Sequence, residues 1–185
     1  TIVWTGEYLS LDSTALNSVC RIDNFGTLRL ESTIDFQLFL DGGYDCTFNN
    51  KPGAVITKPV VANYAPNTVF QQSSGFANAK LNNQGTISVN AGRLIVLGSA
   101  EFMNGTRFEG GGVTLLNGGL TTKKVSGQVT IANGATLETG IGGLDGNGYG
   151  GVTIEGTPAG SINTEGTGTF LVGSGTYFDG TINLN

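Results

Sequence analysis

The sequence predicts an all-β fold, a single parallel β-helix (β-solenoid) with almost no helix, from three observations. A phrase of two short strands joined by a bend rich in asparagine and glycine begins at Cys20 and returns at Cys46 and Ala79. Short segments along the whole chain alternate apolar with small polar residues, as strands do when one face is buried. No window carries apolar residues at i, i+3, i+4 and i+7, the pattern of a helix. Strand pairs that return every few tens of residues are typical of a solenoid, in which each coil stacks on the previous one.

In chain order, residues 1–19 hold the only tryptophan and one alternating stretch, which predicts an opening strand or cap over the first coil. Residues 20–185 are predicted to form one solenoid domain of about six to eight coils. Two prolines interrupt the alternation and predict a lateral loop insertion at about 57–78. From Gly110 onward glycine is frequent, yet short alternating strands continue to the last residues without a capping helix. We therefore expect an open sheet edge at that end, able to bind another strand.

The repeated phrase also predicts a register. Asn24, Asn50 and Asn83 recur at the bend, where asparagine tolerates left-handed backbone angles. We expect their amides to hydrogen-bond from coil to coil as a short asparagine ladder. The apolar residues before successive bends mark the repeats: Ile22, Phe48, Leu81, Phe108 and Val125. The first three are expected to lie in register in one interior column, each directly over the previous one.

The two cysteines, Cys20 and Cys46, hold the same place in consecutive copies of the phrase. Stacking would bring their Cα atoms to about 4.8 Å, the spacing between strands, which a disulfide tolerates. Two interpretations stay open. A disulfide would imply an oxidising compartment, whereas free thiols would pack as small apolar residues.

Charge is scarce and unevenly placed. Only 12% of residues are charged, and the net charge is −5. Nine acids and nine bases cancel within residues 1–124, so the whole net charge lies in residues 125–185, which hold no base and five acids: Glu138, Asp145, Glu155, Glu165 and Asp179. Without a basic patch, nucleic-acid binding is excluded. No apolar run approaches the roughly 20 residues that span a bilayer, so we expect no membrane insertion.

The sequence predicts a non-catalytic protein. It contains no histidine, which removes Ser-His-Asp and Cys-His catalysis and the commonest transition-metal ligand. Its aspartates are scattered, so no carboxylate pair suited to glycoside hydrolysis is evident. No cofactor is expected. Calcium is the best ion hypothesis, at the oxygen-rich turn that contains Asp145 and Asn147, although an ordinary Asp-Gly turn explains the same residues.

Three tyrosines, Tyr44, Tyr64 and Tyr149, fall in predicted loops beside Asp or Asn. Aromatic rings flanked by polar groups stack on sugar rings, so these residues are the candidate glycan contacts. Exposed loop tyrosines without a ligand are the alternative.

Two segments, residues 82–94 and 129–137, read NNQGTISVNAGRL and VTIANGATL. They resemble the degenerate repeats of large secreted bacterial β-helix proteins of the filamentous-haemagglutinin and autotransporter-passenger kind. The resemblance covers about residues 20–185 and implies a right-handed parallel β-helix with a surface-exposed, adhesive role. The chain departs from the pattern in its two cysteines, which such passengers usually avoid.

We therefore expect an extracellular, cell-surface protein: a non-catalytic structural or adhesive β-solenoid that is a segment or a self-associating subunit of a fibre. Its expected partners are further copies bound end to end, or a glycan or protein receptor on a cell surface or in the extracellular space. The alternative is a carbohydrate-binding or polysaccharide-cleaving β-helix module of a secreted or phage-borne fibre. That alternative rests on the association of the fold with such activities.

Overall fold

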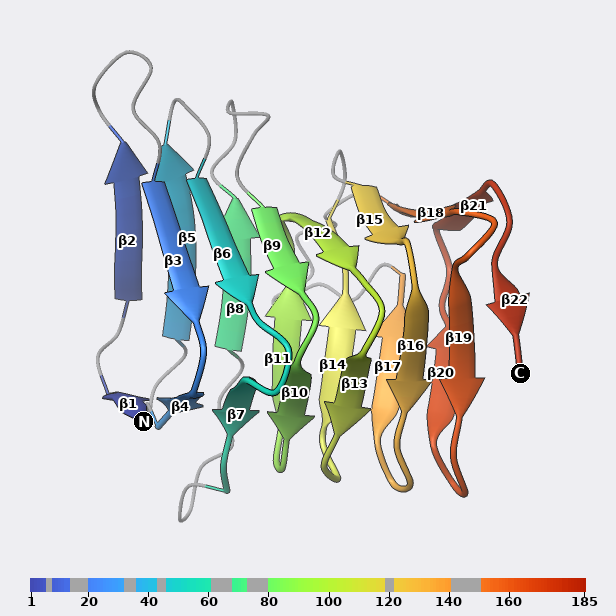
Figure 1. Ribbon diagram of the computed structural model, residues 1–185, viewed down its shortest axis with the longest axis horizontal. Coiled ribbons are helices and arrows are strands. Elements are labelled where there is room, and N and C mark those ends of the chain that lie inside the picture. The colour runs from blue at the N-terminus through green and yellow to red at the C-terminus, as the bar shows by residue number, and fades with distance from the viewer. Residues whose placement is uncertain are drawn as a thin grey trace.

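The computed structural model describes residues 1–5, 8–13, 20–31, 36–42, 46–60, 68–72, 80–118, 122–140 and 151–185. These residues form 22 strands with turns between them, and none of them lies in a helix. Each strand pairs in parallel with the strands three before and three after it in the chain. The strands therefore wind as one parallel β-helix whose coils contribute one strand to each of three sheets, as the sequence predicts (Figure 1).

Sheet A has eight strands: β1 (Ile2–Trp4), β4 (Thr27–Leu30), β7 (Val55–Lys58), β10 (Thr86–Val89), β13 (Thr106–Glu109), β16 (Gln128–Ile131), β19 (Ser161–Thr164) and β22 (Asn183–Leu184). Sheet B has seven: β2 (Tyr8–Ser13), β5 (Phe36–Gly42), β8 (Thr68–Gln72), β11 (Arg93–Val96), β14 (Val113–Leu116), β17 (Thr136–Thr139) and β20 (Thr169–Val172). Sheet C also has seven: β3 (Cys20–Asn24), β6 (Cys46–Asn50), β9 (Lys80–Asn83), β12 (Ser99–Phe102), β15 (Thr122–Val125), β18 (Val152–Gly156) and β21 (Thr176–Asp179).

The coil is right-handed. In Figure 1 the coils advance from left to right, the nearer strands β3, β6 and β9 run downward, and the farther strands β5, β8 and β11 run upward. This is the hand that parallel strands adopt in nearly all crossover connections, because it follows from the twist of the strands.

The predicted interior column of Ile22, Phe48 and Leu81 is confirmed. Ile22 lies opposite Phe48, and Phe48 lies opposite Leu81. The column then continues through later coils as Ala100, Lys123, Ile154 and Phe178. Alternate residues of these strands are buried, so this column faces the core of the solenoid.

Two of the residues that mark the repeat, Phe108 and Val125, do not occupy the position of Ile22, Phe48 and Leu81. Phe108 lies in sheet A, between Ile87 and Ile131, and not in sheet C. Val125 lies in sheet C but in line with Asn83, through Phe102, at the bend position. The reason is that a coil has three corners, and an apolar residue followed by a glycine-rich turn occurs at more than one of them.

The core is filled from all three sheets. Phe48, Phe102 and Phe108 are among its largest fully buried side chains. The rings of Phe102 and Phe108 meet edge to face, with centroids 5.4 Å apart, a favoured aromatic geometry. Sheets C and A therefore share one continuous apolar interior.

Two described stretches within residues 1–19 are opening strands of the solenoid: β1 is the first strand of sheet A, and β2 is the first strand of sheet B. Within the predicted insertion at 57–78, residues 68–72 form β8, which pairs between β5 and β11. Residues 61–67 and 73–79 lie outside the described part of the chain. In the described ranges, no helix is long and apolar enough to cross a membrane.

Candidate functional site

The chemical sites expected from the sequence fall largely where the structure gives no description. Asp145 and Asn147, the calcium candidates, and Tyr44, Tyr64 and Tyr149, the glycan candidates, all lie outside the described residues. The residues that are described contain no group of three or more Cys, Asp or Glu side chains suited to a metal ion. The features with the best-defined geometry are two ladders, three charged groups and the two ends of the rod.

The asparagine ladder runs through the first three coils. Asn24 Nδ2 donates to Asn50 Oδ1 at 2.8 Å, and Asn50 Nδ2 donates to Asn83 Oδ1 at 2.7 Å. The ladder ends at Thr106, whose hydroxyl accepts from Asn83 Nδ2 at 3.3 Å and donates to the Asn83 carbonyl at 2.7 Å. All four side chains are buried, so the amides satisfy one another where water is absent. The ladder fixes the corners of neighbouring coils relative to one another.

A second ladder, which the sequence analysis missed, runs along the outer face. Asn49 Nδ2 donates to Asp23 Oδ1 at 2.9 Å, and Asn82 Nδ2 donates to Asn49 Oδ1 at 2.8 Å. The signal was present in the paired residues Asp23-Asn24, Asn49-Asn50 and Asn82-Asn83. Successive residues of a strand point to opposite faces, so each pair supplies one inner and one outer rung.

Asp23 begins the outer ladder and carries two cations. Arg21 Nη2 lies 2.7 Å from Asp23 Oδ2, and Lys51 Nζ lies 3.1 Å from Asp23 Oδ1. The hydrogen bond from Arg21 is the main reason that the pKa of Asp23 falls to about 2; partial desolvation opposes this fall, and Lys51 and Asn49 add smaller contributions to it. The group carries two positive charges against one carboxylate at the first coil of the rod.

Cys20 and Cys46 lie directly opposite each other in β3 and β6. The structure has no disulfide between them; Cys46 is buried, and Cys20 is partly exposed and packs against the core. The stacked arrangement expected from the repeat is therefore present, here as two thiols.

Lys123 is the unexpected member of the interior column. Its side chain is completely buried, and its Nζ donates to the carbonyl oxygens of Leu97, at 3.2 Å, and Gly98. Burial lowers the pKa of this amine to about 7, because a low-dielectric interior disfavours the charged form. The sequence offered two adjacent lysines, Lys123 and Lys124, and only the register shows which one faces inward.

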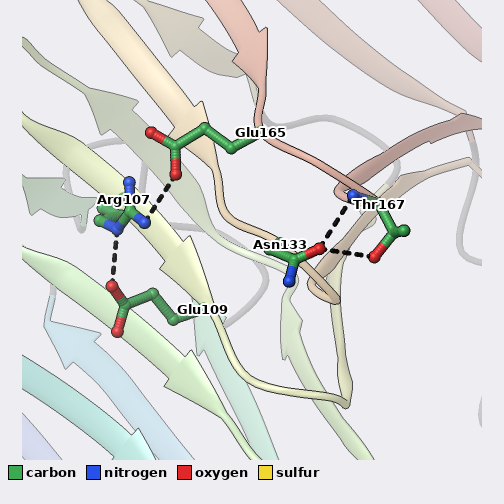
Figure 2. A network of polar contacts seen from close by, with 5 residues as sticks. All are labelled: Arg107, Glu109, Asn133, Glu165 and Thr167. Carbon is green, nitrogen blue, oxygen red and sulfur yellow. Dashed lines mark hydrogen bonds and ion pairs between the residues drawn. The ribbon is translucent and has the colours of Figure 1, made fainter.

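A network on sheet A ties together coils that are far apart in the chain (Figure 2). Arg107 Nε donates to Glu109 Oε1 at 2.6 Å, and Arg107 Nη2 donates to Glu165 Oε2 at 2.7 Å. Beside it, Asn133 Oδ1 accepts from the backbone N and the hydroxyl of Thr167, at 3.0 and 2.8 Å. The hydrogen bonds between Arg107 and the two carboxylates raise the pKa of Arg107, and the bond from Arg107 lowers the pKa of Glu165. One guanidinium holds both carboxylates, which makes the group a tie between coils.

The two ends of the rod differ from its sides. Of the nine large apolar side chains that are exposed in the described residues, eight lie in the first or last coil. The first coil has Ile2, Val3 and Phe25, and the last has Leu171, Val172, Tyr177, Phe178 and Leu184. The ninth, Val60, follows β7.

The N-terminal end also contains an apolar pocket of about 380 Å³. It is lined by Trp4, Ile22, Leu28 and Phe48 from the core and by Phe25 at the bend, with residues 1, 2, 23, 24, 26 and 27 around them. At this end β1, β2 and β3 are the edge strands of the three sheets, and β22, β20 and β21 are the edge strands at the other end; no other described strand pairs with their outer sides.

Comparisons with known proteins identify no relative: no family model, no curated protein and no solved structure matches this chain. The geometry of the solenoid and of its two ends is therefore the basis for a functional proposal.

Proposed function

We propose that this chain is a non-catalytic structural or adhesive β-solenoid of an extracellular, cell-surface fibre, in which further solenoid coils continue the rod at its ends. Those coils belong either to the same polypeptide, as a segment of a longer fibre, or to other copies, as stacked subunits. The observation that carries the proposal is that exposed apolar side chains gather at the two ends of the described rod, where all three sheets have open edges.

The physical reason is the cost of an uncovered coil. The edge of a parallel sheet presents a row of unpaired N–H and C=O groups, which pair readily with another strand. The first and last coils also leave half-exposed the side chains that other coils bury, such as Phe178 at 48% exposure in the column where Ile154 is buried. A further coil would remove both costs at once.

The shape suits a spacer or display role. Seven or eight strands per sheet, at about 4.8 Å per coil, give a rod of roughly 30 Å. The length of the rod grows with the number of stacked coils. The hydrogen bonds between coils point along the rod, so the sides of the rod remain available for contacts.

Electron microscopy and sedimentation velocity over a wide range of concentrations test the extension of the rod. We expect particles whose length grows with concentration in steps of one rod. Single short particles at every concentration would contradict self-association, and expression of the chain with its flanking sequence would then show whether neighbouring coils cover the ends.

A glycan array with a parallel assay for reducing-sugar release tests the adhesive role. Binding without cleavage supports adhesion to a glycan. Release of reducing sugar would contradict the non-catalytic assignment and favour the polysaccharide-cleaving alternative.

A further inference from the structure

We infer that Cys20 and Cys46 form a binding site for one soft, singly charged metal ion of the Cu(I) or Ag(I) type, held between the two thiolates. This inference goes beyond the proposed function and does not depend on it, since the site uses only the contact between two neighbouring coils. The evidence comes from the register of the two cysteines, from the hydrogen bonds that hold their strands and from the chemistry of a thiol pair.

The two cysteines are paired directly across neighbouring strands. β3 and β6 lie side by side in sheet C, and Cys20 is the residue opposite Cys46 (Figure 1). Cys46 is completely buried, and Cys20 packs against the same core from the adjacent coil. The only two thiols of the chain therefore lie next to each other on the interior face.

Hydrogen bonds further along the same two strands hold the spacing of this pair. Asn49 Nδ2 donates to Asp23 Oδ1 at 2.9 Å, and Asn24 Nδ2 donates to Asn50 Oδ1 at 2.8 Å. Side chains at paired positions of parallel strands leave the sheet in the same direction, so the two cysteine Cβ atoms keep the strand spacing of about 4.8 Å. The two thiols are thus held side by side with little freedom to approach each other.

This spacing is unfavourable for a disulfide. The Cα separation is acceptable, but a disulfide needs Cβ atoms that are about 3.5 to 4.5 Å apart. Closing the pair to that distance would pull β3 and β6 together against their backbone hydrogen bonds and against both ladders. The structure accordingly has no disulfide between the two residues.

The same spacing suits a metal ion that lies between the two sulfur atoms. A metal–thiolate bond is about 2.3 Å long, so two such bonds in a line span about 4.6 Å, close to the strand spacing. Soft ions such as Cu(I) and Ag(I) prefer thiolate ligands and bind two of them in a line. Zinc and iron centres take three or four protein ligands, and the described residues offer no such group. The pair therefore selects an ion that needs only two ligands.

Binding of the ion adds a negative charge that nearby side chains offset. Each thiol releases one proton to solvent, so the singly charged ion and its two thiolates together carry one negative charge. On the outer face of the same strands, Arg21 and Lys51 share the single carboxylate of Asp23, which leaves one positive charge in excess. The attraction between these two charges favours the loaded site.

Titration of the fully reduced chain with Ag(I) tests the site. We expect native mass spectrometry to show one ion per chain, and thiol titration to show that both thiols have become unreactive. The melting temperature should rise, because the folded chain holds the two thiols together and binds the ion more tightly than the unfolded chain does. Absence of a bound ion, or a melting temperature that falls on binding, would overturn the inference.

Variants locate the ion. Cys20→Ser and Cys46→Ser each remove one ligand, so each variant should lose the bound ion. Met103→Leu is the matched control, because Met103 holds the only other sulfur atom of the chain, and it should bind the ion as the unmodified chain does. Binding that survives in either serine variant, or that is lost in Met103→Leu, would place the ion elsewhere and overturn the inference.

A measurement on the unmodified chain guards against loss of folding in the variants. X-ray absorption of the chain loaded with Cu(I) should show two sulfur neighbours at about 2.3 Å and no third ligand. Sedimentation velocity should show no dimer that the ion induces. A third ligand, or an ion that bridges two chains, would contradict a site made by one pair of coils.

Refolding in a mixture of reduced and oxidised glutathione distinguishes the metal site from a disulfide. Oxidised glutathione would accept the two electrons of the thiols, form the S–S bond by exchange and leave as two reduced glutathione molecules. We expect the refolded chain to keep both thiols, because the Cβ atoms are too far apart for an unstrained bond. A chain that is lighter by two hydrogen atoms and no longer takes up Ag(I) would show that the pair forms a disulfide, and the inference would fail.

Discussion

The first three coils of this rod and the three that follow build the same corner with different chemistry. At the end of sheet C, the first three coils place Asn24, Asn50 and Asn83 in one column. The later coils place Phe102, Val125 and Gly156 at the same position. The corner is held by amide hydrogen bonds between coils in the first region and by apolar packing and close backbone contact in the second.

The difference shows that backbone pairing between parallel strands defines the coil. The corner accepts different residues, provided that their polar groups have hydrogen-bond partners and their side chains fit. A buried amide is tolerated when each donor and acceptor has a partner, and the asparagine ladder provides those partners. A glycine serves where the next coil approaches too closely for a side chain. At Gly156 an added Cβ would lie 2.2 Å from the Thr181 carbonyl oxygen.

The largest expected effect comes from breaking the asparagine ladder of the first three coils. Asn50→Ala removes the central rung: Asn83 Oδ1 loses its donor, and Asn24 Nδ2 keeps only its longer bond, 3.3 Å, to the Val55 carbonyl oxygen. We expect a loss of about 3 to 4 kcal/mol in the free energy of unfolding, because buried polar groups are costly when unpaired. Urea denaturation measures it. Asn49→Ala, on the neighbouring outer ladder, is the control and should cost about 1 kcal/mol. Equal losses would show that burial of the ladder contributes nothing.

The next largest effect is expected from disturbing a close backbone contact in the later coils. Gly127→Ala would place a Cβ 2.2 Å from the backbone N of Asn104 in the preceding coil. We expect a loss of about 2 to 3 kcal/mol, since the coils would have to separate locally. At Gly111 an added Cβ meets nothing within 4 Å, so Gly111→Ala should change stability by about 0.5 kcal/mol or less. Similar thermal unfolding of the two variants would refute the close-contact explanation.

The smallest effect sharpens the comparison at Lys123, the one charged residue in the interior column. Its pKa is about 7 in the folded protein and about 10.4 in an unfolded chain. Between these values the unfolded state binds more protons, so stability should rise with pH, by about 2 kcal/mol from pH 7 to pH 9. Lys123→Met should abolish this rise.

The control for that measurement is Lys124→Met. Lys124 is adjacent in sequence but lies on the outer face, 3.6 Å from Glu155. This variant should keep the same rise of unfolding free energy with pH. A rise that survives in Lys123→Met would assign the proton uptake to another group.

The sequence succeeded where a local phrase carries the register. Ile22, Phe48 and Leu81 share a phrase with their asparagines, so both the column and the ladder could be predicted. It failed at Phe108, because one coil has three corners with similar local patterns. Two adjacent lysines do not indicate that Lys123 is the buried one. Alternation shows that they point to opposite faces of the strand, but it does not show which face is the core.

By itself, the sequence determined the all-β class, the parallel stacking and the position of the asparagine ladder, because these follow from alternation and from a repeated phrase. Only the tertiary structure decided the three-sheet coil, the burial of Lys123, the tie made by Arg107 and the pocket at the N-terminal end. The physical reason is that each of these features depends on the number of residues between successive corners of the coil. That length sets which residues of distant segments meet, and no local pattern encodes it.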